Sequence, residues 1–91
     1  LKAVKGKLSE QCAAIFEYLM IGASLTTTSA LYPGIPMEDG YLHIGDLRRR
    51  IKDLKDHNDV AISCEMMPGG YKRWYMSEED IKANRQKSFT K

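Results

Sequence analysis

Residues 44–55 carry the sequence IGDLRRRIKDLK, which contains the clearest periodic pattern in the chain. Its apolar residues recur at helical spacing and fall on one face of an α-helix. With about 100 degrees of rotation per residue, Arg49 and Lys52 fall opposite that face. Arg48 and Lys55 lie on one shoulder of the same outer surface. The segment therefore predicts a helix with a basic outer face and an apolar inner stripe. The stripe consists of Ile44, Leu47, Ile51 and Leu54.

Length and composition predict one small domain and do not identify its partner. The 91 residues are 43% hydrophobic and 29% charged, which suits one modest core and argues against a disordered chain. The formal net charge is +2, so composition alone does not predict nucleic-acid binding. Because the chain begins with Leu1 and not with Met, we expect it to be a piece of a longer protein.

The cysteines and the apolar runs predict where the protein resides. Cys12 and Cys64 are too few and too far apart for a zinc site. We expect two reduced core thiols, and a disulfide only if the fold brings them together. The apolar runs are too short to cross a bilayer, and no secretory signal is present. We therefore expect a cytoplasmic protein with no membrane partner.

Capping and turn residues divide the chain into elements. Ser9, Thr26 and Ser77 are suitable N-caps for three of the expected helices. Pro68, Gly69 and Gly70 supply the turn of a hairpin. The expected elements are a flexible basic arm (1–8), a first helix (9–21), a short second helix (26–32), a loop (33–40), a third helix (41–57), two strands (60–66 and 71–76), a short C-terminal helix from residue 77, and a basic tail (82–91).

Three helices followed by a two-stranded hairpin predict an α+β fold, mainly α, of the winged helix-turn-helix class. The predicted domain covers residues 9–81, with a two-stranded β-hairpin wing and a short C-terminal helix. The tip of the hairpin, residues 67–72, is the predicted wing. In such a domain the third helix is the element that enters the major groove of DNA.

The chain also resembles the small helix-turn-helix domain family found widely in phage and prophage proteins. The resemblance covers about Ser9 to Met76, but residues 35–41 make the turn before the third helix longer than the family pattern. It implies DNA binding by a viral or prophage protein in replication, recombination or transcription regulation. The matching residues are Gln11-Cys12, Thr26, Ala30-Leu31, Gly34, Arg50-Ile51-Lys52-Asp53-Leu54, Glu65 and Arg73-Trp74-Tyr75.

The third helix carries the main candidates for DNA contact. Arginine presents a planar fork that can bind guanine through two hydrogen bonds, and lysine binds phosphate as a compact charge. The alternative is a solvated helix face on which Asp53 and Asp56 neutralise nearby cations at i, i+3 and i, i+4 spacing. The candidates are Arg48, Arg49, Lys52 and Lys55.

Further DNA-contact candidates lie on the hairpin and at the start of the second helix. Lys72 and Arg73 follow the glycine turn and can lie along the DNA backbone or minor groove, unless the hairpin is simply solvated. Hydroxyl and backbone N–H groups at a helix N-terminus can bind phosphate, although Thr26 also suits plain capping. The hydroxyl candidates are Thr26, Thr27 and Thr28.

Three other residues are expected to have structural roles. Arg50 lies on the shoulder opposite Arg48, where an ion pair with Asp46 or Asp53 is at least as plausible as a DNA contact. Trp74 and Tyr71 could stack on bases, but a tryptophan in a hairpin packed on helices usually belongs to the core.

The sequence shows no enzyme chemistry. It contains no nucleophile–base–acid set, no glycine-rich phosphate loop and no paired carboxylates in an apolar context, and His43 and His57 have no metal ligands at suitable spacing. We expect no cofactor, no metal and no small-molecule substrate. The expected partner is double-stranded DNA. The alternative is a protein-interaction or homodimerisation module that does not bind DNA.

Overall fold

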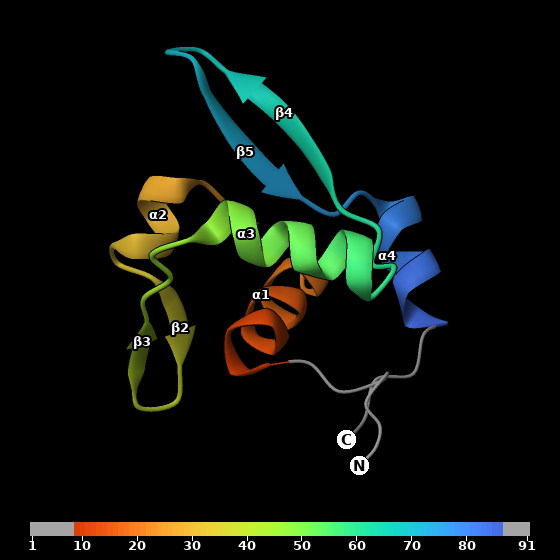
Figure 1. Cartoon of the computed structure of the whole chain (residues 1–91), viewed down its shortest axis with the longest axis horizontal. Coiled ribbons are helices and arrows are strands. Elements are labelled where there is room, and N and C mark those ends of the chain that lie inside the picture. Colours follow the sequence, from red (N-terminus) through yellow and green to blue (C-terminus); the bar gives the residue numbers. More distant parts are fainter. Residues whose placement is uncertain (1–8, 87–91) are drawn as a thin grey trace.

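The computed structural model describes residues 9–86 of the chain. Figure 1 shows α3 crossing the centre of the molecule, with one hairpin above it and a second hairpin below α2. The elements are α1 (Glu10–Met20), β1 (Ser24–Leu25), α2 (Thr27–Leu31), β2 (Ile35–Met37), β3 (Gly40–Leu42), α3 (Leu47–Lys52), the π-helical η1 (Asp53–His57), β4 (Ser63–Met67), β5 (Tyr71–Tyr75) and α4 (Glu78–Arg85).

The inner face of α3 is buried as the sequence pattern predicts. Leu47 and Ile51 are buried on α3, and Leu54 is buried on the π-helical turn η1 that continues the same helix. α1 packs against this face and contributes Ile15 and Leu19, which are fully buried. The Ser9 hydroxyl caps α1 by accepting a hydrogen bond from the Cys12 amide at 3.2 Å. The helix phase deduced from residues 44–55 is therefore confirmed.

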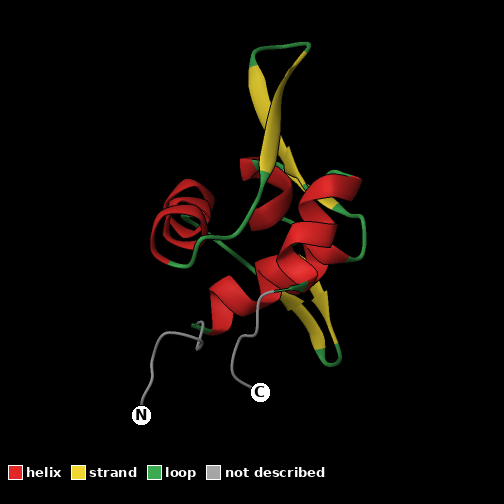
Figure 2. Cartoon of the chain, turned by 90° about the vertical axis from the view of Figure 1, so that its right-hand side faces the viewer, coloured by secondary structure: helices red, strands yellow, loops and turns green. Residues whose placement is uncertain are grey.

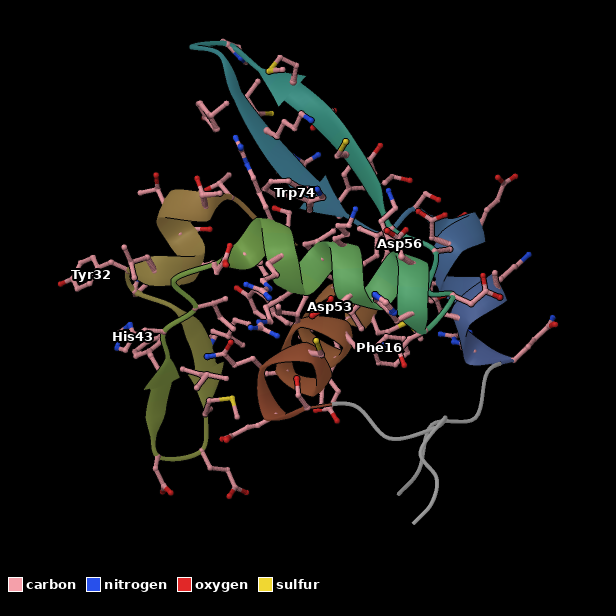
Figure 3. The ribbon with its side chains drawn as sticks, viewed as in Figure 1. Phe16, Tyr32, His43, Asp53, Asp56 and Trp74 are labelled. Carbon is pink, nitrogen blue, oxygen red and sulfur yellow. The ribbon has the colours of Figure 1, made fainter. Side chains whose placement is uncertain are left out.

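The larger sheet has three antiparallel strands in the order β1-β5-β4. Leu25 of β1 and Cys64 of β4 both pair with Trp74 of β5. Trp74 is buried at the base of the hairpin, next to α3 (Figure 3), so the prediction that it belongs to the core is confirmed. β1 was not predicted, because two residues are too few to show an alternating pattern.

Residues 35–42 form a β-hairpin where a loop (33–40) and the start of the third helix were expected. In this second sheet Ile35 pairs with Leu42 and Pro36 pairs with Tyr41. Ile35 is buried and anchors the hairpin to the core, whereas the paired residues further along it are exposed. Figure 2 shows the two hairpins at opposite ends of the molecule.

The expectation of a winged helix-turn-helix is wrong. Over residues 9–86 the chain is a small α+β fold with four α-helices and two small antiparallel sheets. The segment between α2 and α3 is a separate β-hairpin and not a turn, so the third helix begins at Leu47 and not at Tyr41. The expected two-stranded wing is part of a sheet of three strands, since β1 pairs with β5.

Several burial and boundary expectations also need correction. Cys64 was expected to be a core thiol but is exposed, Leu31 is also exposed, and Phe16 is only half-buried. α2 has five residues, of which only Ala30 is buried, so Leu31 at its last position faces solvent. Both cysteines are free thiols.

The C-terminal helix is longer than expected. α4 continues to Arg85, so residues 82–85 are helical where a tail was expected. Asn84 is buried in this extension and holds it against the preceding chain: its side chain accepts a hydrogen bond from the Ala61 amide at 2.8 Å and donates one to the Ala61 carbonyl at 2.9 Å. The expected arm, residues 1–8, and the end of the expected tail, residues 87–91, lie outside the described residues.

The hairpin between α2 and α3 predicts a specific glycine requirement. Gly34 and Gly22 both have φ of +95°, but a Cβ atom on Gly34 would lie 2.6 Å from the Leu42 carbonyl oxygen, whereas one on Gly22 would meet nothing within 4 Å. Gly22→Ala should therefore lower the free energy of unfolding by about 1–2 kcal/mol, the cost of holding an alanine in the left-handed backbone conformation. Gly34→Ala should cost about 1–3 kcal/mol more, because β2 and β3 must move apart.

Urea unfolding of both variants measures this difference. Equal losses of unfolding free energy in Gly34→Ala and Gly22→Ala would contradict the close approach of Gly34 to β3.

Candidate nucleic-acid interface

Arg48 and Arg49 lie on the outer side of the first turn of α3. Burial of Leu47 and Ile51 fixes the rotation of the helix, so both arginines are exposed. Within residues 9–86, neither guanidinium makes an ion pair with a carboxylate. The sequence-predicted pair is therefore accessible and electrostatically free in the described part of the chain.

Arg50 takes a different position, as the helical projection predicted. Its Nη1 atom lies 3.2 Å from Oδ2 of Asp53, at i, i+3 spacing. Arg50 is half-buried, and its Nε atom is buried with no hydrogen-bond partner in the described residues. The expectation of a structural ion pair is confirmed, with Asp53 and not Asp46 as the partner.

Lys52 is paired but remains accessible. Its Nζ atom lies 3.6 Å from Oδ2 of Asp56, at i, i+4 spacing, and both side chains are exposed. Figure 3 shows Asp53 and Asp56 on successive turns of this helix. An exposed pair of this kind contributes only about 0–1 kcal/mol, so a phosphate group can replace Asp56 at little cost. The neutralisation by Asp53 and Asp56 that the sequence suggested is therefore partial.

Lys55 lies on η1, close enough to the start of α4 to affect Asp80. Burial raises the pKa of Asp80. Hydrogen bonds from Ser63 and Ser77 and the positive charge of Lys55 together lower the pKa by more than burial raises it, so the pKa lies below the ordinary 3.8. The Ser63 hydroxyl donates to Oδ2 of Asp80 at 2.6 Å, and the Ser77 amide donates to the same oxygen at 3.1 Å. Part of the charge of Lys55 is thus balanced within the protein.

The β4–β5 hairpin brings one free cation to its tip. Lys72 is exposed and makes no ion pair within residues 9–86, and Tyr71 beside it is also exposed. Arg73 is engaged: its Nε atom donates to Oε2 of Glu65 at 2.7 Å, and its guanidinium lies 4.8 Å from the centre of the Tyr75 ring. Of the two predicted hairpin contacts, the structure leaves Lys72 available and holds Arg73 in the sheet.

The threonines have different environments. Thr26 caps α2 and forms a reciprocal capping box with Ser29, with distances of 2.9 and 3.0 Å. Thr27 and Thr28 are exposed at the start of a helix of five residues. The Ile44 amide donates to the Ala30 carbonyl at 2.8 Å, which ties the entry of α3 to α2. The capping role of Thr26 is confirmed, and all three hydroxyls lie on the element next to α3.

Two further features of the described residues concern metal ligands and helices that could cross a membrane. Within residues 9–86, no three His, Cys, Asp or Glu side chains are grouped as metal ligands. His43 has its Nδ1 atom 2.8 Å from the Leu31 carbonyl oxygen. None of the helices in this range combines the length and apolarity needed to cross a bilayer.

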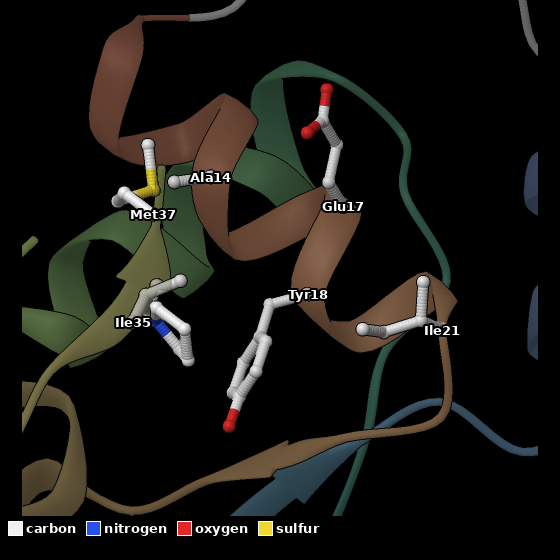
Figure 4. A pocket seen from close by; sticks show the side chains of 7 residues that line it. Ala14, Glu17, Tyr18, Ile21, Ile35 and Met37 are labelled. Atoms are coloured by element: carbon white, nitrogen blue, oxygen red, sulfur yellow. The ribbon is translucent and has the colours of Figure 1, made fainter. Parts of the chain in front are cut away.

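A small pocket between α1 and β2 was missed from the sequence. It has a volume of about 200 Å³ and lies between Tyr18 of α1, Ile21 just after α1, and Met37 of β2 (Figure 4). No sequence signal indicates this pocket, because residues 33–40 were expected to be a loop and β2 has only three residues. None of the residues that line the pocket belongs to α3.

Comparisons of the chain with known protein families, with curated proteins and with solved structures give no match. The functional argument therefore rests on the geometry and charges of this chain.

The contacts of Asp80 predict a pH dependence of stability. A carboxyl whose pKa is lowered in the folded state stabilises the fold above its unfolded pKa, and this contribution is lost as pH falls through the folded pKa. Asp80→Asn should lower the free energy of unfolding at neutral pH and should flatten its fall between about pH 5 and 2.

Chemical unfolding at a series of pH values tests this, with Asp39→Asn at the exposed β2–β3 turn as the matched control. The control should change stability by less than about 0.5 kcal/mol. Identical pH profiles for Asp80→Asn and the parent protein would refute a stabilising role of the Asp80 carboxylate.

Proposed function

We propose that this protein binds duplex DNA with the outer face of α3. The observation that carries the proposal is the exposure of Arg48 and Arg49, two adjacent cations with no ion-pair partner within residues 9–86. Their neighbour Leu47 is buried, so the arginines are presented on a rigid helix and not on a loop. A pre-positioned guanidinium can bind phosphate, or a guanine edge, with little loss of conformational freedom.

The distribution of charge along the chain supports this orientation. Residues 9–47 contain no lysine or arginine, whereas residues 48–55 contain five. The net charge of +2 therefore conceals a local asymmetry, because the α3–η1 helix carries five of the fourteen lysine and arginine residues against two carboxylates. A concentrated basic surface attracts a polyanion at long range and orients the encounter.

The hairpin offers a second contact with the same partner. Figure 1 shows β4 and β5 rising from the body of the molecule beside α3. Lys72 near the tip is exposed and unpaired in the described part of the chain, and it suits a phosphate of the backbone. Arg73 contributes less, because Glu65 and the Tyr75 ring already hold its guanidinium.

The proposal implies a division of labour among these side chains. Lys52 and Lys72 would contact phosphates, and Arg49, which projects directly away from the apolar stripe, is the residue we propose for base contact. A role in phage-type regulation, recombination or replication, and an intracellular location, are consistent with such a DNA-binding domain and belong to the same proposal.

A salt titration measures the number of phosphate contacts. If Arg48, Lys52 and Lys72 meet phosphates while Arg49 contacts a base, the slope of log K against log salt should be about −3. Replacing both Arg48 and Arg49 with Ala should bring the slope to about −2 and weaken binding at every sequence. Thermal stability should barely change, because both side chains are exposed.

The control is Lys82→Ala, which removes one exposed cation from α4 and should affect the slope less than the double variant. The readout is fluorescence anisotropy with a labelled duplex of mixed sequence between about 50 and 200 mM salt. Absence of duplex binding by the parent protein at low salt, or an unchanged slope in the double variant, would refute the proposal.

A further inference from the structure

Most of the large exposed apolar side chains of the described residues belong to one stretch of the chain, from residue 21 to residue 41. Ile21 is 79% exposed, Tyr32 is 79% exposed and Tyr41 is 55% exposed. Leu31 and Met37 are also exposed. Figure 3 shows Tyr32 projecting from the body of the molecule. Tyrosine and methionine are enriched at protein–protein interfaces, and clustered exposed apolar residues often mark one.

A pocket lies within this surface. Tyr18 and Ile21 border it on the α1 side, and Pro36 and Met37 border it on the β2 side (Figure 4). Pro36 pairs directly with Tyr41 on β3, and cross-strand partners lie on the same face of a sheet, so Tyr41 adjoins this rim. We call these residues around the pocket, together with Glu17, which also lines it, the α1–β2 surface.

The volume of the pocket indicates what can enter it. At about 200 Å³ it is smaller than typical small-molecule sites, which begin at about 300 Å³. A cavity of about 150 Å³ accommodates a benzene-sized group, so this pocket has room for a single apolar side chain. The size therefore favours the anchor residue of a polypeptide over a free metabolite.

The charge around the pocket indicates which sign of charge a binding partner should carry. Residues 9–47 carry five carboxylates and no lysine or arginine, and none of these carboxylates makes an ion pair within residues 9–86. Glu17 lines the pocket, and Glu38 and Asp39 lie at the turn of the β2–β3 hairpin beside it. DNA and anionic lipid surfaces would be repelled here, whereas lysine or arginine side chains would be attracted.

We propose that the α1–β2 surface docks a protein partner that inserts one apolar side chain flanked by lysine or arginine. The apolar pocket would hold the anchor, and Glu17 would pair with a flanking cation. This surface differs from the α3 face in both its residues and its charge, so the proposal does not depend on DNA binding.

The probe is a short synthetic peptide with one leucine between pairs of lysines, added to the isotopically labelled protein. We expect saturable shifts of the amide signals of residues 14–21 and 35–41 in NMR spectra. A peptide with alanine in place of the leucine, and one with glutamate in place of the lysines, should each lose most of this effect. Unchanged spectra with the leucine–lysine peptide, or equal shifts with all three peptides, would overturn the proposal.

Two variants separate the apolar and electrostatic parts. Ile21→Ser removes an exposed apolar side chain from the rim of the pocket. It should lower the affinity for the peptide at least severalfold without unfolding the protein. Glu17→Gln should lower the affinity for the peptide roughly two- to fivefold at low salt, which is the range expected for one exposed ion pair. The control Glu79→Gln on α4 should leave this affinity unchanged. Equal affinities for the parent protein and both rim variants would contradict the assignment.

The same spectra reveal the main competing occupant. Shifts of residues 14–21 and 35–41 that depend on protein concentration without any peptide would show that a second copy of the chain covers the surface. That result would overturn the proposal that the partner is a basic polypeptide. Failure of the DNA titration would leave the peptide result unaffected, because the two experiments use different probes and different residues.

Discussion

Burial of the apolar stripe of α3 against α1 is the contact on which the rest of the structure depends. Leu47, Ile51 and Leu54 are removed from water on one side of the helix, and Ile15 and Leu19 cover them from α1. Each such side chain contributes about 1.5–3 kcal/mol when fully buried, far more than any surface ion pair of this fold. The hydrophobic contact, and not the charges, therefore decides how α3 is rotated.

That rotation has a direct electrostatic consequence. Once the apolar stripe faces inward, Arg48 and Arg49 face outward, and Arg50 reaches the carboxylate of Asp53. Neutralisation is selective, because spacing along the helix pairs Arg50 and Lys52 but leaves the two preceding arginines free among residues 9–86. The basic surface arises from the packing of the core and from this incomplete pairing.

The same chain carries a second surface of opposite character. The carboxylates of residues 9–47 and the apolar side chains around the α1–β2 pocket lie on elements that precede α3. A nucleic acid would be attracted to α3 and repelled from this region.

The sequence predicts local features well and contacts between distant segments poorly. The helix phase of α3, the N-caps and the Arg50–Asp53 pair follow from spacing within one element, so they could be deduced. The β2–β3 hairpin could not, because its strands have three residues each and Pro36 and Gly40 are typical of loops. The pairing of Arg73 with Glu65 depends on the β4–β5 register, which places them opposite each other.

The most direct test of DNA binding by α3 is an NMR titration of the labelled protein with a mixed-sequence duplex. We expect the largest shifts at Arg48, Arg49 and Lys52, with smaller ones near Lys72. Shifts confined to residues 14–41, or no shifts at all, would contradict DNA binding by α3.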